Sequence, residues 1–231
     1  MRSRFSAGIR HRLQPLYERT LAKPVRQLFF MDIVRKTGNF GTPTWDGVTI
    51  WQNLFDLWTI TETIQALRPK LIIETGTYLG GSALYYANLL DLIGDGRIIS
   101  MDVDDRHQRE HHRIEFLIGD STSDQVVMRG RDAAAMCGGP VLVILDSDHH
   151  AEHVLREMEA YAPSVTPGSY MLVQDGAIDV VPTMKPGYPG PLRAIKQFLP
   201  QHPEFEVDEQ RCDRWLITHH PMGWLHRRAH A

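Results

Sequence analysis

Five carboxylates stand at or just beyond the ends of short apolar segments, at Glu74, Asp102, Asp120, Asp146 and Asp175. An ionised carboxylate only accepts hydrogen bonds, so it suits hydroxyl pairs, ammonium groups and hard cations. If the apolar segments are parallel strands of one sheet, the five acids meet at one edge, beyond the carboxyl ends of the strands. Because acids without a shared role would scatter, this arrangement predicts a ligand-binding site.

The first of these acids opens a glycine-rich turn, ETGTYLGGS, that runs from Glu74 to Ser82. Glycines let the backbone approach a ligand, and the following helix points its first amide groups into the site. The turn departs from the Gly-x-Gly-x-x-Gly pattern that binds pyrophosphate, and its carboxylate favours a cationic ligand such as S-adenosylmethionine. The cofactor-binding residues expected here are Glu74, Gly76, Thr77, Gly80, Gly81 and Ser82. The alternative is that Glu74 caps the turn and the glycines only permit tight packing.

The next two acids suit the nucleoside half of the same cofactor. Asp102 ends the second expected strand, where its oxygens can accept hydrogen bonds from both ribose hydroxyls. Asp120 and Ser121 follow the third strand and are expected to face the adenine. A local turn that starts the next helix is the alternative for this pair.

The last two acids predict a metal site. Asp146, Gln174 and Asp175 offer oxygen atoms from two strand ends, which is the ligand type that Mg²⁺ prefers. We therefore expect these three residues to hold a magnesium ion, with Asp146 also bordering the cofactor.

Three histidines follow the first metal-site aspartate, at positions 149, 150 and 153. His149 is expected to be the general base, because a neutral imidazole is a natural proton acceptor near neutral pH. A zinc-binding trio is one alternative, and a histidine that only starts a helix is the other.

A parallel sheet is needed to bring these residues together. Apolar segments at 71–73, 97–101, 115–118, 141–145 and 170–173 predict its strands, and the stretches between them predict helices. A further helix is expected at 51–68, and the tail predicts an antiparallel hairpin formed by 205–207 and 215–218. The predicted fold class is α/β, a Rossmann-like and mostly parallel sheet with helices on both faces.

The chain's charge is unevenly distributed. Residues 1–36 carry a net charge of about +7, which leaves the rest of the 231 residues at about −10. The expected division is a basic helical arm and lid segment at 1–50 and a catalytic domain at 51–231. The arm is expected to pack on the body or on a second subunit, so a homo-oligomer is expected, and an anionic partner or membrane surface is the alternative.

Several classes of protein are excluded by composition. No apolar run is long enough to span a membrane, and the basic beginning of the chain lacks the apolar core of a secretory signal, so a cytoplasmic protein is expected. Cys137 and Cys212 alone give neither a disulfide framework nor a zinc site. The arm lacks the interleaved aromatic residues that grip single strands, so no nucleic-acid partner is expected.

Four stretches of the sequence resemble the cephalosporin hydroxylase and rhamnosyl O-methyltransferase family: LIIETGTYLGGS at 71–82, VILDSDHHAEH at 143–153, YAPSVTPG at 161–168 and PGPLRAIKQFL at 189–199. The resemblance extends from about Trp45 to Trp224. It implies a seven-stranded methyltransferase sheet, with S-adenosylmethionine and magnesium as cofactors.

The resemblance also implies roles for particular residues. Glu74, Gly76 and Asp102 fall where the cofactor is bound, and Asp146 with the pair at 174–175 falls where the metal is bound. His149 stands where catechol-type methyltransferases have a catalytic lysine. Gln174 replaces an acid of the cephalosporin enzyme, and the loss of one negative charge is expected to weaken binding of the ion.

The expected function is magnesium-dependent transfer of a methyl group to a hydroxyl of a small molecule, and the resemblance alone implies a sugar or natural product as acceptor. The loop 176–191 with Tyr188, and Trp45 and Trp51, are candidate lids, with core packing as the alternative for the tryptophans. A nicotinamide-dependent oxidoreductase on the same sheet and a catalytically silent cofactor-binding subunit are the rival functions.

Overall fold

The chain divides into two compact units, residues 1–38 and 39–231. The structure is a computed structural model that describes residues 14–36, 41–181 and 189–229. In the first unit, residues 14–20 and α2 (Ala22–Lys36) are helical, as expected for the arm, and residues 5–13 of the expected helix lie outside the described part. The expected division of the chain at residue 50 stays a prediction.

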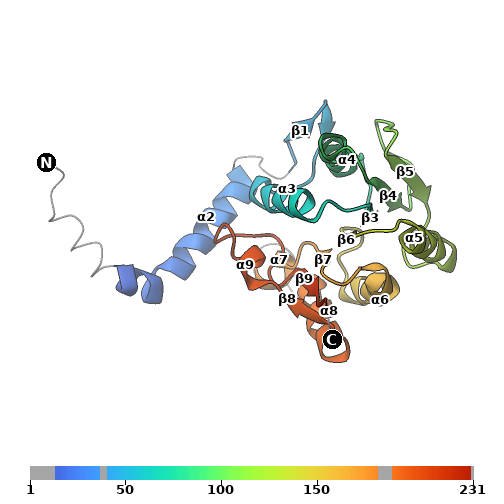
Figure 1. Ribbon diagram of the computed structural model, residues 1–231. Helices are drawn as coiled ribbons and strands as arrows, with labels where there is room; N and C mark the ends of the chain where they lie inside the picture. The colour runs from blue at the N-terminus through green and yellow to red at the C-terminus, as the bar shows by residue number, and fades with distance from the viewer. Residues whose placement is uncertain (1–13, 37–40, 182–188, 230–231) are drawn as a thin grey trace, which may run out of the picture. The chain divides into compact units, whose positions relative to one another are not determined.

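The second unit is built on a seven-stranded sheet in the order β5-β4-β3-β6-β7-β9-β8 (Figure 1). The strands from β5 to β7 are parallel, and β9 and β8 add an antiparallel edge. The chain runs outward from β3 to β5 and then returns to the other side of β3, so the strand order reverses between β3 and β6. The strands are β3 (Leu71–Thr75), β4 (Arg97–Asp102), β5 (Ile114–Ile118), β6 (Val141–Leu145), β7 (Tyr170–Val173), β8 (Phe205–Val207) and β9 (Trp224–Arg227).

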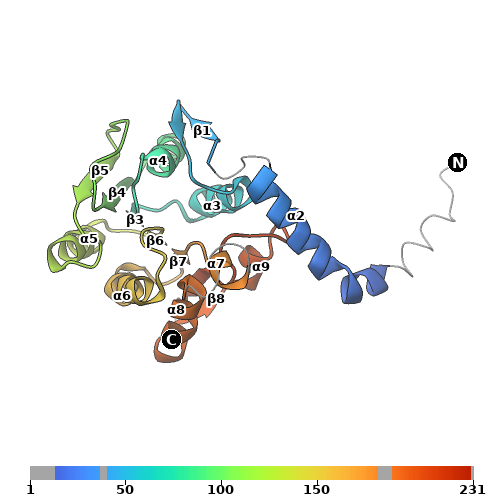
Figure 2. The same cartoon turned by 180° about the vertical axis from the view of Figure 1, so that it is seen from behind.

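Helices cover both faces of this sheet because the central strands are apolar on both sides. Leu71 and Ile73 of β3 belong to one buried cluster and Ile72 to another, and β6 alternates in the same way. The first cluster includes side chains of α5 (Asp124–Met136), α6 (Ala151–Tyr161) and α8 (Pro191–Phe198). The second includes side chains of α3 (Leu54–Leu67), α4 (Gly81–Ile93) and α9 (Glu209–Cys212). Figures 1 and 2 show the two layers from opposite sides.

Shorter elements complete the unit. A two-stranded ribbon, β1 (Thr44–Trp45) and β2 (Val48–Thr49), precedes α3. The remaining helical segments are α7 (Ala177–Val180) and two 3-10 turns, Ala162–Ser164 and Leu199–Gln201. The helix expected at 51–68 is shorter than predicted, because the side chain of Asn53 accepts a hydrogen bond from the main chain of Phe55 and sets the first turn.

The antiparallel edge is confirmed, but its second strand was placed wrongly by the sequence. β8 matches the expected segment 205–207, whereas its partner β9 lies at Trp224–Arg227 and not at 215–218. Residues 215–218 form irregular structure instead, because the side chain of Thr218 and the main chain of His219 donate hydrogen bonds to the buried Asp56 of α3.

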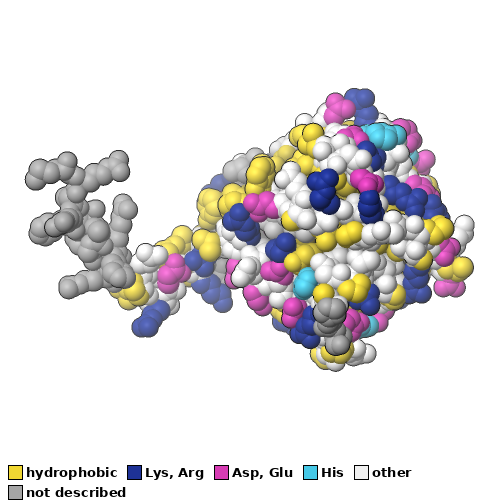
Figure 3. Space-filling view, viewed as in Figure 1, with side chains coloured by type: hydrophobic (Ala, Val, Ile, Leu, Met, Phe, Trp, Pro, Cys, Tyr) yellow, Lys and Arg dark blue, Asp and Glu magenta, His cyan; other side chains and the backbone are white. Residues whose placement is uncertain are grey.

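The surface of the second unit carries interspersed acidic and basic side chains (Figure 3). Within the described residues, no helix combines the length and the apolar character that crossing a membrane requires.

Ile144 tests the two-sided burial of β6. Its side chain is fully buried, so Ile144→Ala is expected to lower the free energy of unfolding by about 2–5 kcal/mol, through lost burial and the cavity left behind. Leu92→Ala is the control, because Leu92 is 83% exposed and its truncation should change stability by less than about 0.5 kcal/mol. Urea unfolding measures both, and equal effects would contradict the described packing.

Candidate active site

A cavity of about 530 Å³ lies at the carboxyl ends of β3, β4 and β6, where the strand order reverses. Its size suits a small-molecule ligand. Most of the residues expected from the sequence line it: Gly76, Thr77, Gly81, Ser82, Asp102, Asp120, Ser121, Asp146, His149 and Asp175. Glu74, Gly80 and Gln174 do not.

Glu74 lies behind the cavity wall. It is 1% exposed, and its two oxygens accept hydrogen bonds from Ser82 Oγ and Ser100 Oγ, each at 2.6 Å. Burial raises the pKa of Glu74 from 4.5 to about 7, against the effect of the two serine hydrogen bonds. Glu74 therefore does not contact the cavity itself, but it holds the side chain of Ser82, which lines the cavity.

The glycines of the first turn are explained by packing against protein backbone. A Cβ at Gly76 would lie 2.0 Å from the carbonyl oxygen of Asp146, and one at Gly81 would lie 2.1 Å from that of Thr49. Gly80 caps α4 with φ of 82°. Gly76 and Gly81 still line the cavity, so tight packing and a close approach to a ligand coexist here.

Asp102 holds the same turn from the next strand. One of its carboxylate oxygens accepts a hydrogen bond from the main chain of Tyr78 at 2.7 Å, and the other accepts one from Asp104 at 3.1 Å. Tyr78 has a left-handed backbone, with φ of 47°, which a non-glycine residue rarely adopts. Asp102 thus stabilises the turn and also lines the cavity.

Asp120 and Ser121 follow β5 in a local turn. One carboxylate oxygen of Asp120 accepts hydrogen bonds from both the main chain and the hydroxyl of Thr122 at 2.8 Å. Ser121 donates its hydroxyl to Glu157. The turn that the sequence left open as an alternative is therefore present, and both residues nevertheless line the cavity.

Asp146, His149 and Asp175 form a group whose ligand atoms all lie within 4.8 Å of one another. His149 Nε2 is 3.2 Å from Asp175 Oδ2. Removal from water and the nearby Asp175 carboxylate raise the pKa of Asp146 well above its usual range. Asp175 Oδ1 is buried without a hydrogen-bond partner. Two close carboxylates with an unsatisfied oxygen fit a divalent cation.

Gln174 is buried and shares a hydrogen-bond donor with Asp146, and its expected role as a metal ligand stays a prediction. It is 2% exposed, and its side-chain oxygen accepts a hydrogen bond from Gln52 Nε2 at 2.7 Å. The same Nε2 also donates to Asp146 at 2.9 Å. Gln52 was not expected from the sequence, because nothing in a single polar residue before a helix indicates a partner 94 positions away.

The other two histidines have separate surroundings. His150 is the residue that caps α6. His153 lines the cavity, with its Nε2 3.1 Å from Ser121 Oγ, and a hydrogen bond to Glu157 raises its pKa.

The two candidate lid tryptophans also differ. Trp51 lines the cavity beside Tyr78, with ring centroids 5.9 Å apart. Trp45 donates its indole N–H to Asn88 of α4 and does not line the cavity. Tyr188 and the neighbouring residues 182–187 lie outside the described part of the chain.

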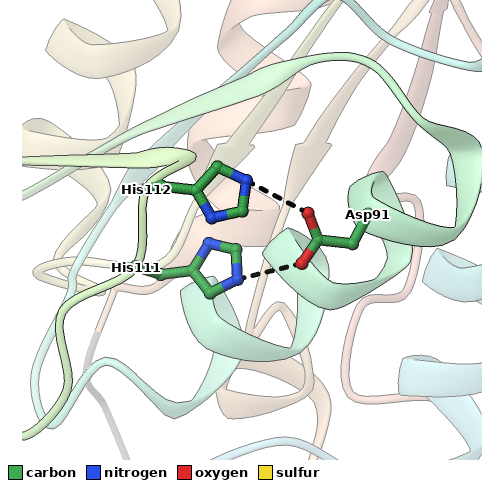
Figure 4. Close-up of side chains that lie close together, drawn as sticks. All are labelled: Asp91, His111 and His112. Carbon is green, nitrogen blue, oxygen red and sulfur yellow. Dashed lines mark hydrogen bonds and ion pairs between the residues drawn. The ribbon is translucent and has the colours of Figure 1, made fainter.

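A second group of metal-ligand type lies outside the cavity, at Asp91, His111 and His112 (Figure 4). Here Arg113 Nε is 2.5 Å from Asp91, and this hydrogen bond lowers the pKa of the Asp91 carboxyl. A cation is therefore already paired with this carboxylate, in contrast to Asp146. His111 Nδ1 also accepts a hydrogen bond from the main chain of Arg113. These contacts are those of a surface ion-pair cluster.

Comparisons with a family model and with known proteins point to the same family. Residues 39–228 match the family model described as Rhamnosyl O-methyltransferase/CmcI. The Rhamnosyl O-methyltransferase of Mycobacterium tuberculosis is 33% identical over 192 residues, covering 80% of this chain and 78% of that protein. The protein of the same name from Mycobacterium leprae is 32% identical over 198 residues, covering 83% and 86%.

Solved structures share the fold. A CmcI apo-structure superposes with a TM-score of 0.64 at 21% identity, covering 83% of this chain and 78% of that chain. A CmcI structure with Mg and SAM has the same TM-score and identity, covering 82% and 78%. The seven-stranded sheet with its antiparallel edge is thus a methyltransferase fold.

Buried Glu74 makes stability depend on pH. Between pH 4.5 and about 7 the folded state holds the Glu74 proton while the unfolded state releases it, so its contribution to stability falls as pH rises through this window. Urea unfolding at about pH 5 and about pH 8 is expected to show Glu74→Gln gaining stability relative to wild type at the higher pH. Exposed Glu152→Gln is the control and should track wild type, and a parallel response of both variants would contradict the assignment.

Proposed function

Because the chain belongs to the Rhamnosyl O-methyltransferase/CmcI family, and is thereby an S-adenosylmethionine-dependent O-methyltransferase, we propose that it methylates a sugar hydroxyl of a small molecule with the help of a divalent cation. The relatives are named for a rhamnosyl acceptor, which supports a sugar-containing substrate. Family membership and the departure of the glycine turn from the dinucleotide pattern both argue against a nicotinamide-dependent oxidoreductase.

The observation that carries this proposal is the shared cavity. The glycine turn and Asp102 line the same space as Asp146, His149 and Asp175. A methyl donor and a cation-bound acceptor can therefore meet within one cavity, where orientation alone supplies a large part of the rate.

Two parts of the cavity suit the proposed cofactor. Asp102 would accept hydrogen bonds from the ribose hydroxyls, a role supported by its carboxylate, which only accepts, and by its position in the cavity lining at the end of β4. Ser82, held by Glu74, lines the cavity at the start of α4. A helix N-terminus and a carboxylate behind it suit the carboxylate and ammonium groups of an amino acid.

The proposed chemistry needs a base and a charge stabiliser. A divalent cation supplies, when bound, positive charge that lowers the pKa of an acceptor hydroxyl. Asp146 and Asp175 would hold this ion, and Gln52 orients Asp146 through its hydrogen bond. His149 accepts the hydroxyl proton, and Asp175 orients the imidazole through the 3.2 Å contact with Nε2. Trp51 and Tyr78 give the cavity an aromatic wall for the acceptor.

Methyl transfer from S-adenosylmethionine to glycosides and other hydroxylated compounds tests the proposed function. A gain of one methyl group by mass is expected with Mg²⁺, together with loss of activity in EDTA and recovery on adding the ion. Asp146→Asn should abolish the response to the ion. Asp91→Asn, in the surface cluster, is the matched control and should retain it. Full turnover in chelator would remove the cation from the mechanism.

The role of His149 is separable from metal binding. If His149 is the base, His149→Gln should lower turnover by roughly 10²- to 10⁴-fold and remove the acidic limb of the pH–rate profile, with Mg²⁺ affinity nearly unchanged. His150→Gln, at the adjacent helix cap, is the control and should behave as wild type. A loss of Mg²⁺ affinity that matches the loss of turnover would instead make His149 a ligand.

A further inference from the structure

One face of α6 converges on a single residue of the cavity wall. His153, Glu157 and Tyr161 are spaced four positions apart, so they share a helix face. Each of them contacts Ser121: His153 Nε2 lies 3.1 Å from its hydroxyl, Glu157 accepts that hydroxyl at 2.6 Å, and the Tyr161 hydroxyl donates to its carbonyl oxygen at 2.7 Å. Ser121 is thereby held at both its side chain and its main chain.

Glu157 is the centre of this arrangement. It is 0% exposed, and its Oε1 also accepts a hydrogen bond from Ser147 Oγ at 2.6 Å. Its Oε2 is buried and has no hydrogen-bond partner. Ser121 follows β5 and Ser147 follows β6, and both line the cavity. One buried carboxylate thus joins two segments of the cavity wall that come from different strands.

A buried carboxylate lowers the stability of the fold, so its presence at position 157 calls for a functional reason. Burial of an ionisable side chain costs free energy that an apolar side chain in the first buried cluster would not cost, and the ring nitrogen that offsets this for Glu157 is His153 Nε2, 3.5 Å from its Oε1. Glu157 contacts the hydroxyl groups of two serines and the ring nitrogen Nε2 of His153, and none of these groups belongs to the proposed metal site or is the proposed base. Glu157 therefore takes no direct part in the proposed methyl transfer.

We propose that Glu157, with Tyr161, is a positioning residue that fixes Ser121 at the nucleobase end of the cavity and thereby makes the site selective for adenine. This inference rests on the proposed binding of S-adenosylmethionine. If Asp102 binds the ribose at the end of β4, the adenine lies nearest the next strand outward, β5, and the turn that follows β5 at Ser121 contacts it. A turn held through two atoms of Ser121 by three side chains presents fixed donors and acceptors to the edge of the base, and fixed polar groups are what reject a mismatched base.

The test is calorimetric binding of S-adenosylhomocysteine and S-inosylhomocysteine, in which the amino group of adenine is replaced by a carbonyl. Wild type is expected to prefer the adenine compound. Glu157→Leu should weaken binding of S-adenosylhomocysteine by about 10- to 100-fold and bring the ratio of the two affinities toward one, because Ser121 and Ser147 lose their acceptor. Tyr161→Phe keeps the ring in the core and should give a smaller change in the same direction. Mg²⁺ affinity should stay unchanged in both.

Glu152→Gln, on the exposed side of the same helix, is the matched control and should retain wild-type affinity and selectivity. A lower unfolding temperature with an unchanged affinity ratio in both Glu157→Leu and Tyr161→Phe would show that these side chains only stabilise the fold, and would overturn the inference. Absence of S-adenosylhomocysteine binding to wild type would overturn the proposed function and this inference with it, so the two failures are distinguishable.

Discussion

Repulsion between two neighbouring carboxylates in a confined space is the constraint on which the site depends. Asp146 and Asp175 follow the adjacent strands β6 and β7, and removal from water together with the nearby Asp175 carboxylate raises the pKa of Asp146. Asp175 also has a left-handed backbone, with φ of 58°, which costs on the order of 1–3 kcal/mol for a residue other than glycine. Gln52 and His220 stabilise this geometry, since Gln52 donates to Asp146 and His220 Nδ1 accepts the main-chain N–H of Asp175. The fold thus maintains an arrangement that binding of a cation would favour.

Segments distant in the sequence provide this support. Asp56, in the first turn of α3, accepts hydrogen bonds from the hydroxyl of Thr218 at 2.5 Å and from the main chain of His219 at 2.8 Å. Asn53 lies 2.9 Å from His219 Nδ1. The next residue, His220, contacts Asp175. The first helix of the second unit and the segment before β9 therefore meet behind the metal candidate, which explains why residues 215–218 do not form the strand that their apolar residues predict.

The sequence predicted the parts of the fold that local patterns encode. Strand ends, the glycine turn and the order of elements follow from apolar runs and their spacing, and Asp102, Asp146, His149 and Asp175 line one cavity, while their roles there stay predictions. The remainder depends on packing between distant segments. Gln52, Glu157 and the true last strand carry no local signal, because each is defined by a partner contributed by another element. A carboxylate such as Glu74 can likewise be predicted near the site, whereas its position behind the wall follows only from burial against Ser82 and Ser100.

The close packing of Thr49 on Gly81 has a practical consequence for handling the protein. The carbonyl of Thr49 occupies the space that a side chain at Gly81 would need, and Thr49, Trp51 and Gln52 all border the cavity. The short ribbon before α3 therefore forms part of the cavity wall. An expression fragment cut at residue 51 would open the pocket on that side, whereas one cut at residue 39, where both the compact unit and the family match begin, would keep the wall in place.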